Sequence, residues 1–183
     1  MRKLLVEAIG TFMLVAVICG ATLISFAAES GSSGILGVAM AAGFSVAAMM
    51  YAVGPISGGH FNPAITCGLC AAGRFPLRSI LPYSVAHVVG GALAGLLFYI
   101  ILSSKIGWTP GTFAANGFGE HSPGGFPATA GFATEAIMTA LLVFVFCRVT
   151  REKSGAGLAA PLAIGFTFAA LHVASMPITN TSL

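Results

Sequence analysis

Five long apolar stretches dominate this sequence and restrict what it can fold into. They lie at about 4–28, 34–54, 80–102, 128–147 and 158–175 of the 183 residues. A helix that crosses a lipid bilayer needs roughly 20 apolar residues, and each stretch is near that length. Only 7% of the residues are charged, against about 25% in soluble domains, so too little charge is left to cover a surface that faces water. The sequence therefore predicts an all-α membrane protein, because a helix satisfies its own backbone polar groups in lipid.

The basic residues predict the orientation of the five spans. If the N-terminus is cytoplasmic, seven of the eight Lys and Arg residues fall on the cytoplasmic side and only Lys105 lies outside. Cytoplasmic loops of membrane proteins carry an excess of positive charge, so we expect a multi-pass protein with this orientation. The net charge of +3 then reflects topology and gives no reason to expect a nucleic-acid partner.

The connection between the second and third spans contains a shorter apolar segment. Its middle has only about 10–12 apolar residues, which is too short to span and suggests a re-entrant segment. Asn62 is a good helix cap, and Pro63 fits the first helical position because its missing N–H costs nothing there. Gly73 is expected to end this half-helix.

The residues around this cap suit a small neutral solute. A half-helix that starts inside the membrane points the positive end of its dipole inward, and the Asn62 amide adds hydrogen-bond donors. Just before it, Gly59, His60 and Phe61 can present backbone carbonyls in a row. Acceptors followed by donors and a positive dipole favour water and disfavour a cation. The alternative is a purely structural helix cap.

An internal repeat relates the two halves of the chain. Residues 7–11 resemble 135–139, residues 43–45 resemble 165–167, and Pro55 matches Pro177. With three spans per unit, the second unit must insert upside down, and inverted repeats are typical of transport folds. We expect a single, incomplete domain over 1–183, with a first repeat at about 1–104, an extracellular loop at about 105–127 and a partial second repeat at about 128–183.

Two carboxylates occupy matching positions inside apolar spans. Glu7 and Glu135 are expensive to bury in a membrane and must have partners or a function. One interpretation is a proton relay. Their repetition favours the other, in which each accepts hydrogen bonds from the backbone of a neighbouring non-helical loop.

Enzymatic and metal-binding functions are disfavoured. A membrane enzyme could use His60 or His172 with a glutamate, but no nucleophile–base set converges in the sequence. Cys67 and Cys70 form a C-x-x-C pair that lacks the second pair or histidines of a metal site, so we expect packing residues. We predict no enzyme activity, no cofactor and no metal.

Several motifs resemble one membrane protein family. The segment 57–64, which reads S-G-G-H-F-N-P-A, resembles the first signature box of the major intrinsic proteins, the aquaporins. Residues 2–4, 73–76, 119–125 and 179–182 are similar to bacterial members of that family, in the right order along the whole chain. The resemblance implies an aquaporin-like inverted-repeat helical bundle in a bacterial inner membrane. It also implies a homotetramer with one water pore in each subunit.

The resemblance also implies roles for individual residues. The family pattern puts a water-orienting box, two sets of pore carbonyls and a selectivity filter on positions of this chain. The box is Asn62, Pro63 and Ala64; the carbonyls are those of Gly59, His60, Phe61, Asn180, Thr181 and Ser182; and the filter includes Ala42, His172 and Thr181.

The chain departs from the family pattern in two places. Ala42 stands where the family has an aromatic filter residue, which favours a wider pore that passes ammonia, urea, hydrogen peroxide or glycerol. The chain also ends at Leu183, where the second Asn-Pro-Ala box would begin, so we expect a truncated bundle of five spans plus one re-entrant half-helix. A non-conducting fragment is therefore the other alternative to a water channel.

Overall fold

The computed structural model describes residues 1–25, 34–111, 113–151 and 155–181. Within these ranges every regular element is helical, and five helical segments are long and apolar enough to cross a membrane, which confirms the predicted fold class. The main helices are α1 (Arg2–Gly20), α2 (Gly34–Ser57), α3 (Pro63–Ala71), α4 (Ile80–Ser103), α5 (Ala128–Val149) and α6 (Ala160–Thr179). Short turns extend or join them: η1 (Ala21–Ser25, a π-helical turn), η2 (Leu77–Ser79), η3 (Gly119–His121) and η4 (Gly157–Ala159).

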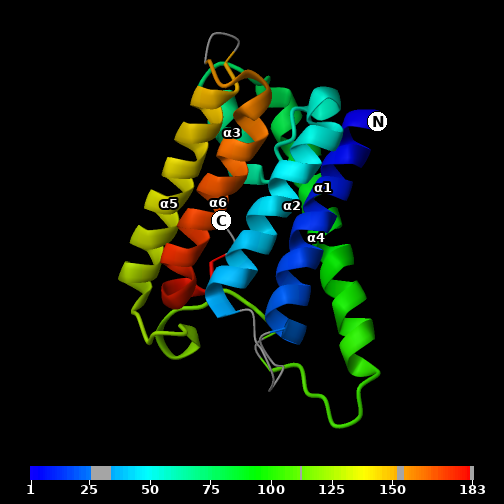
Figure 1. Ribbon diagram of the computed structural model, residues 1–183, viewed down its shortest axis with the longest axis vertical. Coiled ribbons are helices and arrows are strands. Elements are labelled where there is room, and N and C mark those ends of the chain that lie inside the picture. The colour runs from blue at the N-terminus through cyan, green and yellow to red at the C-terminus, as the bar shows by residue number, and fades with distance from the viewer. Residues whose placement is uncertain (26–33, 112, 152–154, 182–183) are drawn as a thin grey trace.

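The five long helices stand side by side as a bundle (Figure 1). Helix α1 packs against α2 and α4, and α6 packs against α2 and α5, so the contacts run in the order α4, α1, α2, α6, α5. The short helix α3 contacts both α4 and α5 and lies at the end of the bundle that carries the N-terminus (Figure 1). It therefore enters the bundle from one side only, as a re-entrant half-helix does.

Two helices extend further than the sequence predicts. The second span continues through Pro55 to Ser57, and the last span continues through Pro177 to Thr179. A proline inside a helix removes one backbone hydrogen bond. Both prolines lie in the last turn, so each helix continues for only two residues beyond its proline and little of it is disturbed. The predicted ends at about 54 and 175 were therefore too early.

Helices α2 and α6 approach each other through matching glycines of the repeat. A Cβ atom built on Gly43 would meet the carbonyl oxygen of Gly165, and one built on Gly165 would meet the carbonyl oxygen of Gly43. Such a reciprocal contact is what a two-fold relation between equivalent elements produces. Small residues let membrane helices pack this closely. The paired motifs of the sequence therefore meet at the centre of the bundle.

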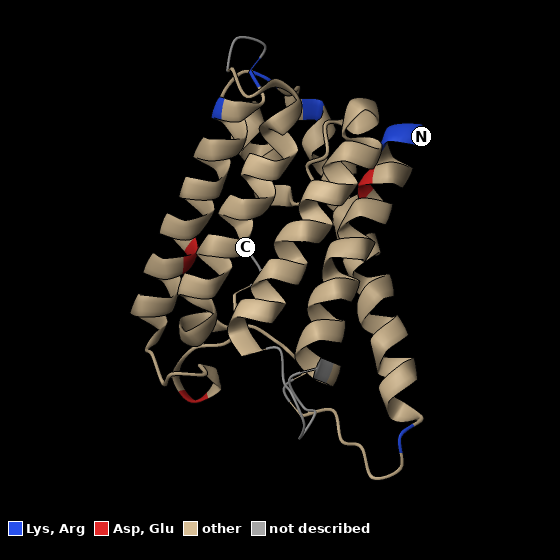
Figure 2. Ribbon diagram, viewed as in Figure 1, with Lys and Arg blue, Asp and Glu red and all other residues tan. Residues whose placement is uncertain are grey.

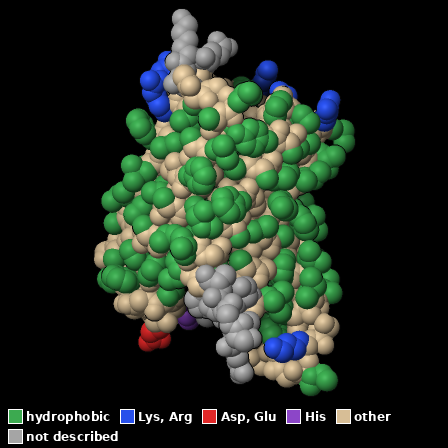
Figure 3. All heavy atoms as spheres, in the orientation of Figure 1, with side chains coloured by type: hydrophobic (Ala, Val, Ile, Leu, Met, Phe, Trp, Pro, Cys, Tyr) green, Lys and Arg blue, Asp and Glu red, His purple; other side chains and the backbone are tan. Residues whose placement is uncertain are grey.

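The outer surface suits a lipid environment. Hydrophobic side chains cover the visible sides of the bundle (Figure 3). Large apolar residues such as Phe44, Val88 and Phe144 are more than half exposed, which would be costly in water. The described Lys and Arg residues gather at the end that carries the N-terminus, with a further basic position at the foot of α4 (Figure 2).

Candidate functional site: a pore along the bundle

The start of α3 is fixed by a side-chain cap. Asn62 has an extended backbone, and its Oδ1 accepts a hydrogen bond of 2.6 Å from the Ala64 N–H. Pro63 occupies the first helical position, as the sequence predicts. The cap uses the carbonyl oxygen of the side chain, so the donors of Asn62 are those of its Nδ2 group.

The far end of α3 is held by Gly73 and Arg74. Gly73 has a φ of 69°, and the Arg74 N–H bonds back to the Leu69 carbonyl at 2.8 Å. The Arg74 guanidinium then donates to the carbonyls of Cys147 and Thr150, at 2.7 and 2.9 Å. Because these carbonyls end α5, one arginine caps that helix and ties it to the half-helix.

Glu7 holds the non-helical segment that precedes the half-helix. Its carboxylate is 0% exposed and accepts hydrogen bonds from the backbone N–H groups of His60, at 3.1 Å, and Phe61, at 2.7 Å. The Nε2 atom of His87 on α4 lies 2.9 Å from the same carboxylate. Thr11 adds a bond from its hydroxyl to the Phe61 carbonyl at 3.0 Å. The Glu7 carboxylate therefore bonds both to loop backbone and to a histidine of α4, and no sequence pattern pointed to the His87 partner.

Glu135 differs from its repeat partner in two respects. It is half-buried where we expected a buried carboxylate, and its Oε1 accepts from the hydroxyls of Thr179, at 2.5 Å, and Thr181. Among the described residues, no backbone N–H of a loop donates a hydrogen bond to Glu135, although we expected such bonds. The reason is local, because α6 stays helical to Thr179 and the Asn180 N–H bonds to the Met176 carbonyl.

The inner half of the path is narrow. A cavity of about 20 Å³ is lined by Gly59, His60, Phe61 and Asn62 together with apolar side chains of α1, α2, α5 and α6. A cavity of that size holds about one water molecule. A wider space of about 610 Å³ opens beside it at the end that carries the N-terminus, and His60 borders both. The predicted inner carbonyl residues therefore lie together, at a constriction.

His60 is oriented by its surroundings. Its Nδ1 atom lies 2.9 Å from the Thr66 hydroxyl, and its ring packs against Phe75 and Tyr83, with centroid separations of 4.8 and 5.2 Å. These contacts come from α3, from the segment after it and from α4. They hold the ring still at the border of the two inner cavities.

The outer half of the path centres on His172. A chamber of about 100 Å³ is lined by His172, Asn180, Thr181 and Asn116, together with residues of α1. His172 is 1% exposed, and neither of its ring nitrogens has a hydrogen-bond partner among the described residues. Its ring stacks on Phe168, which lines the narrow inner cavity, with centroids 5.9 Å apart. The stacked pair therefore separates the inner and outer cavities.

Two predicted site residues fall outside this arrangement. Ala42 is fully buried in the apolar cluster that includes Leu14 and Ile18, and it is not among the described residues that line the chamber. Ser182 lies outside the described residues. Asn116, Thr22 and Cys19 line the chamber although no sequence pattern pointed to them.

In the part of the chain that the structure describes, the titratable side chains do not form a metal-binding cluster. No three of its His, Cys, Asp or Glu side chains lie close enough to hold a metal ion. Its ion pairs include His87 with Glu7, whereas the rings of His60 and His172 have no carboxylate partner there. The four cysteines are free; Cys67 is exposed and Cys70 is half-buried.

Comparisons with known proteins agree with this architecture. The family model described as "Major intrinsic protein" matches residues 1–183. Proteins named Aquaporin Z from Photorhabdus laumondii and Brucella melitensis are each 45% identical, over 100% and 99% of this chain and 80% and 79% of their own length. Aquaporin Z from Bradyrhizobium diazoefficiens is 46% identical over 100% of this chain and 76% of its own length.

A solved structure shares the fold. The X-ray structure of the aquaglyceroporin from Plasmodium falciparum superimposes with a TM-score of 0.82, covering 98% of this chain and 74% of that one at 22% identity. The half-helix and the five spans point to the same family as the matched family model and the similar sequences, both of which extend along the whole chain. The protein belongs to the major intrinsic protein family of aquaporin-type channels.

Proposed function

We propose that this protein is a water channel that mediates passive, osmotically driven water flow across a membrane and excludes protons. The observation that carries the proposal is His172. It is buried, it lines the outer chamber, and its two ring nitrogens lack partners among the described residues. A buried polar group left without a hydrogen bond costs about 1–3 kcal/mol. Water in the chamber would supply the hydrogen bonds that the protein does not give to the His172 ring.

The inner half supports the same proposal. The cavity at Asn62 has room for about one water, which forces single-file passage. The positive end of the α3 dipole at Pro63 disfavours cations, including the hydronium ion. A water held by the Asn62 amide donates its hydrogens away from that amide, which would interrupt a chain of proton transfers. The similarity to relatives named Aquaporin Z supports water as the solute.

The second candidate function is a wider pore for ammonia, urea, hydrogen peroxide or glycerol. It is favoured by Ala42, which stands where the family pattern has an aromatic filter residue. Both candidates involve transport and no enzymatic step.

We further propose the setting in which the channel works. The basic end of the bundle favours a cytoplasmic N-terminus in a bacterial inner membrane (Figure 2). The glycine contact of α2 with α6 supports repeats at about 1–104 and 128–183, separated by the loop at about 105–127. By family relation we propose a homotetramer of such units in the lipid bilayer.

The test is stopped-flow light scattering of proteoliposomes that contain the purified protein. We expect faster osmotic shrinkage than in protein-free vesicles, with no increase in proton leak measured by an internal pH dye. The variant His172→Phe should slow the shrinkage, because it removes both ring nitrogens and fills the chamber. Phe44→Leu, on the exposed face of α2, is the matched control. Shrinkage of the wild type no faster than that of bare lipid would overturn the water-channel proposal.

A further inference from the structure

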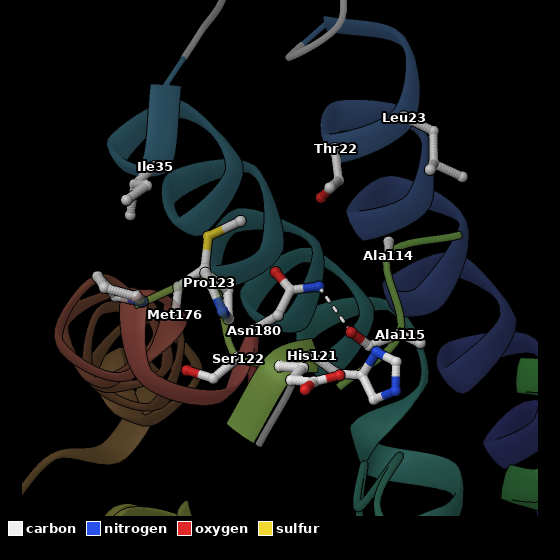
Figure 4. Close-up of a pocket in the computed structure, with 12 residues that line it drawn as sticks. Thr22, Leu23, Ile35, Ala114, Ala115, His121, Ser122, Pro123, Met176 and Asn180 are labelled. Carbon is white, nitrogen blue, oxygen red and sulfur yellow. Dashed lines mark hydrogen bonds between the residues drawn. The ribbon is translucent and has the colours of Figure 1, made fainter. Parts of the chain in front are cut away.

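The outer entrance to the path consists of two connected spaces. An open mouth of about 550 Å³ lies at the outer end of the bundle, beside the chamber of about 100 Å³ that contains His172. Four residues line both spaces, so they form a neck between the mouth and the chamber. These four are Thr22, Ala114, Met176 and Asn180, all labelled in Figure 4.

Two of the four neck residues have little capacity to bind a polar solute. The side chains of Ala114 and Met176 are an alkyl group and a weakly accepting thioether. The Asn180 amide donates to the Ala115 carbonyl at 3.2 Å, the dashed bond in Figure 4. Gly117 donates to the Thr179 carbonyl at 2.9 Å. These two bonds fix the outer loop against the end of α6, so the shape of the neck is set by backbone.

Thr22 adds a polar group that has no partner in the part of the chain that the structure describes. Its hydroxyl oxygen is buried and has no hydrogen-bond partner among the described residues. Figure 4 shows this oxygen pointing from the α1 side into the space that Met176 and Asn180 border. A hydroxyl can donate one bond and accept two, so it can bind a passing solute in either orientation.

The local backbone accounts for the lack of a partner. Threonine and serine hydroxyls in helices usually bond to a carbonyl one turn earlier. Thr167 and Ser175 do so here, at 2.8 and 2.7 Å from the carbonyls of Ala163 and Leu171. Thr22 lies in the π-helical turn η1 that follows α1, where the regular spacing of carbonyls changes. Turns of this kind are frequent at functional sites. A buried polar group without a partner also calls for an explanation, and a functional role for Thr22 would provide one.

We propose that Thr22 is a solute-contacting residue that helps to determine specificity, its hydroxyl forming a hydrogen bond with each small neutral polar solute that passes from the outer mouth to the His172 chamber. This inference rests on the proposed channel function. The hydroxyl carries no charge, so it offsets only a small part of what an ion loses with its hydration shell. A small polar molecule such as water exchanges one hydrogen bond for another as it enters.

The test compares osmotic water permeability, per protein, of reconstituted wild type, Thr22→Val and Thr22→Ser. Valine has nearly the same shape without the hydroxyl, and we expect roughly three- to tenfold lower permeability, the effect of one net hydrogen bond on a rate. Serine keeps the hydroxyl and should stay close to wild type. Thr167→Val is the matched control, because the hydroxyl of Thr167 is already bonded within its own helix. We expect it to conduct like wild type.

The possible outcomes separate the two proposals. Wild type that conducts, with Thr22→Val conducting equally, overturns the role of Thr22 and leaves the channel standing. Wild type that does not conduct overturns both. If Thr22→Val fails to fold by thermal melting and size-exclusion chromatography, Thr22→Ala replaces it. Alanine widens the neck, so lower permeability supports the hydroxyl contact, and equal or higher permeability overturns it.

Discussion

Glu7 is the residue that allows irregular backbone inside an apolar bundle. The segment before α3 has positive φ values at Gly58, Gly59 and Phe61, of 106°, 66° and 51°, so helical hydrogen bonding stops at Gly58, whose N–H bonds to the Gly54 carbonyl, and the N–H groups of His60 and Phe61 need other partners. In lipid, each such group without a partner costs several kcal/mol. The Glu7 carboxylate binds two of them and is itself bonded to His87. A proton relay is not needed to explain this carboxylate.

At this scale we predict that Glu7→Gln destabilises the protein by about 1–3 kcal/mol, because the amide NH₂ group presents a donor to a site built from donors. The measurement is the thermal unfolding midpoint in detergent, together with water permeability after reconstitution. Glu120→Gln, at an exposed position of the outer loop, is the control and should leave the midpoint unchanged. Equal midpoints for wild type and Glu7→Gln would show that the carboxylate is dispensable for loop support.

The wide-pore candidate makes a prediction for Ala42. If its methyl group leaves the filter wide, Ala42→Phe should lower urea and glycerol permeability more than water permeability, because this candidate attributes the width of the filter to the missing aromatic ring. Phe44→Leu, which points away from the bundle, again serves as control. Solute uptake by proteoliposomes in iso-osmotic gradients measures the effect. Equal urea flux in wild type and Ala42→Phe would contradict a wide filter at this position.

At the scale of helices, the contact of α2 with α6 sets how closely the two repeats approach. Both Gly43 and Gly165 place backbone against backbone, with no room for a side chain. The glycines of α4 differ among themselves. A Cβ on Gly90 would meet the Ala8 carbonyl, whereas one on Gly95 would meet nothing within 4 Å.

This difference predicts opposite outcomes for two substitutions of the same kind. Gly165→Ala should lower the unfolding midpoint and the yield of folded protein, since a Cβ there would lie 2.9 Å from the Ala47 Cβ and against backbone. Gly95→Ala should be neutral or slightly stabilising, because alanine is a better helix former by roughly 1 kcal/mol. Both are checked by thermal melting in one detergent. A larger loss for Gly95→Ala than for Gly165→Ala would contradict the packing described for α2 and α6.

At the scale of the whole molecule, the described Lys and Arg residues lie at the two ends of the bundle and are unequal between them (Figure 2). Figure 2 shows the basic residues collected at the N-terminal end, and Figure 3 shows the apolar band between the ends. The charge asymmetry favours one orientation in the membrane. With the proposed cytoplasmic N-terminus, the cavity at His60 would lie on the cytoplasmic side and the neck at Thr22 outside.

We predict the labelling pattern that follows from this orientation. In a background without native cysteines, Lys105→Cys should react in intact cells with a maleimide that cannot cross the membrane. Arg151→Cys, in the loop at the opposite end, should react only after lysis. Both positions are exposed, so reactivity reports the side of the membrane and not burial. The reverse pattern would contradict a cytoplasmic N-terminus.

The sequence by itself determined the elements of this protein. Apolar length defined the five spans, and the Asn62–Pro63 cap and Gly73 marked the half-helix, because these signals act within a few residues of the chain. The repeated motifs also identified the glycines that face each other. The ends of α2 and α6 were missed, since a proline in a last turn looks like a stop signal.

Only the tertiary structure decided which groups meet. Glu7 and its partner His87 are 80 positions apart in the chain. Arg74 lies 73 and 76 positions from the two carbonyls that it caps at the end of α5. The two hydroxyls that donate to Glu135 lie 44 and 46 positions from it. Thr22 is the clearest case, since nothing in its neighbours along the chain marks it. Whether a polar side chain is bonded, lipid-facing or left without a partner beside a cavity depends on how helices pack, and no local pattern encodes that.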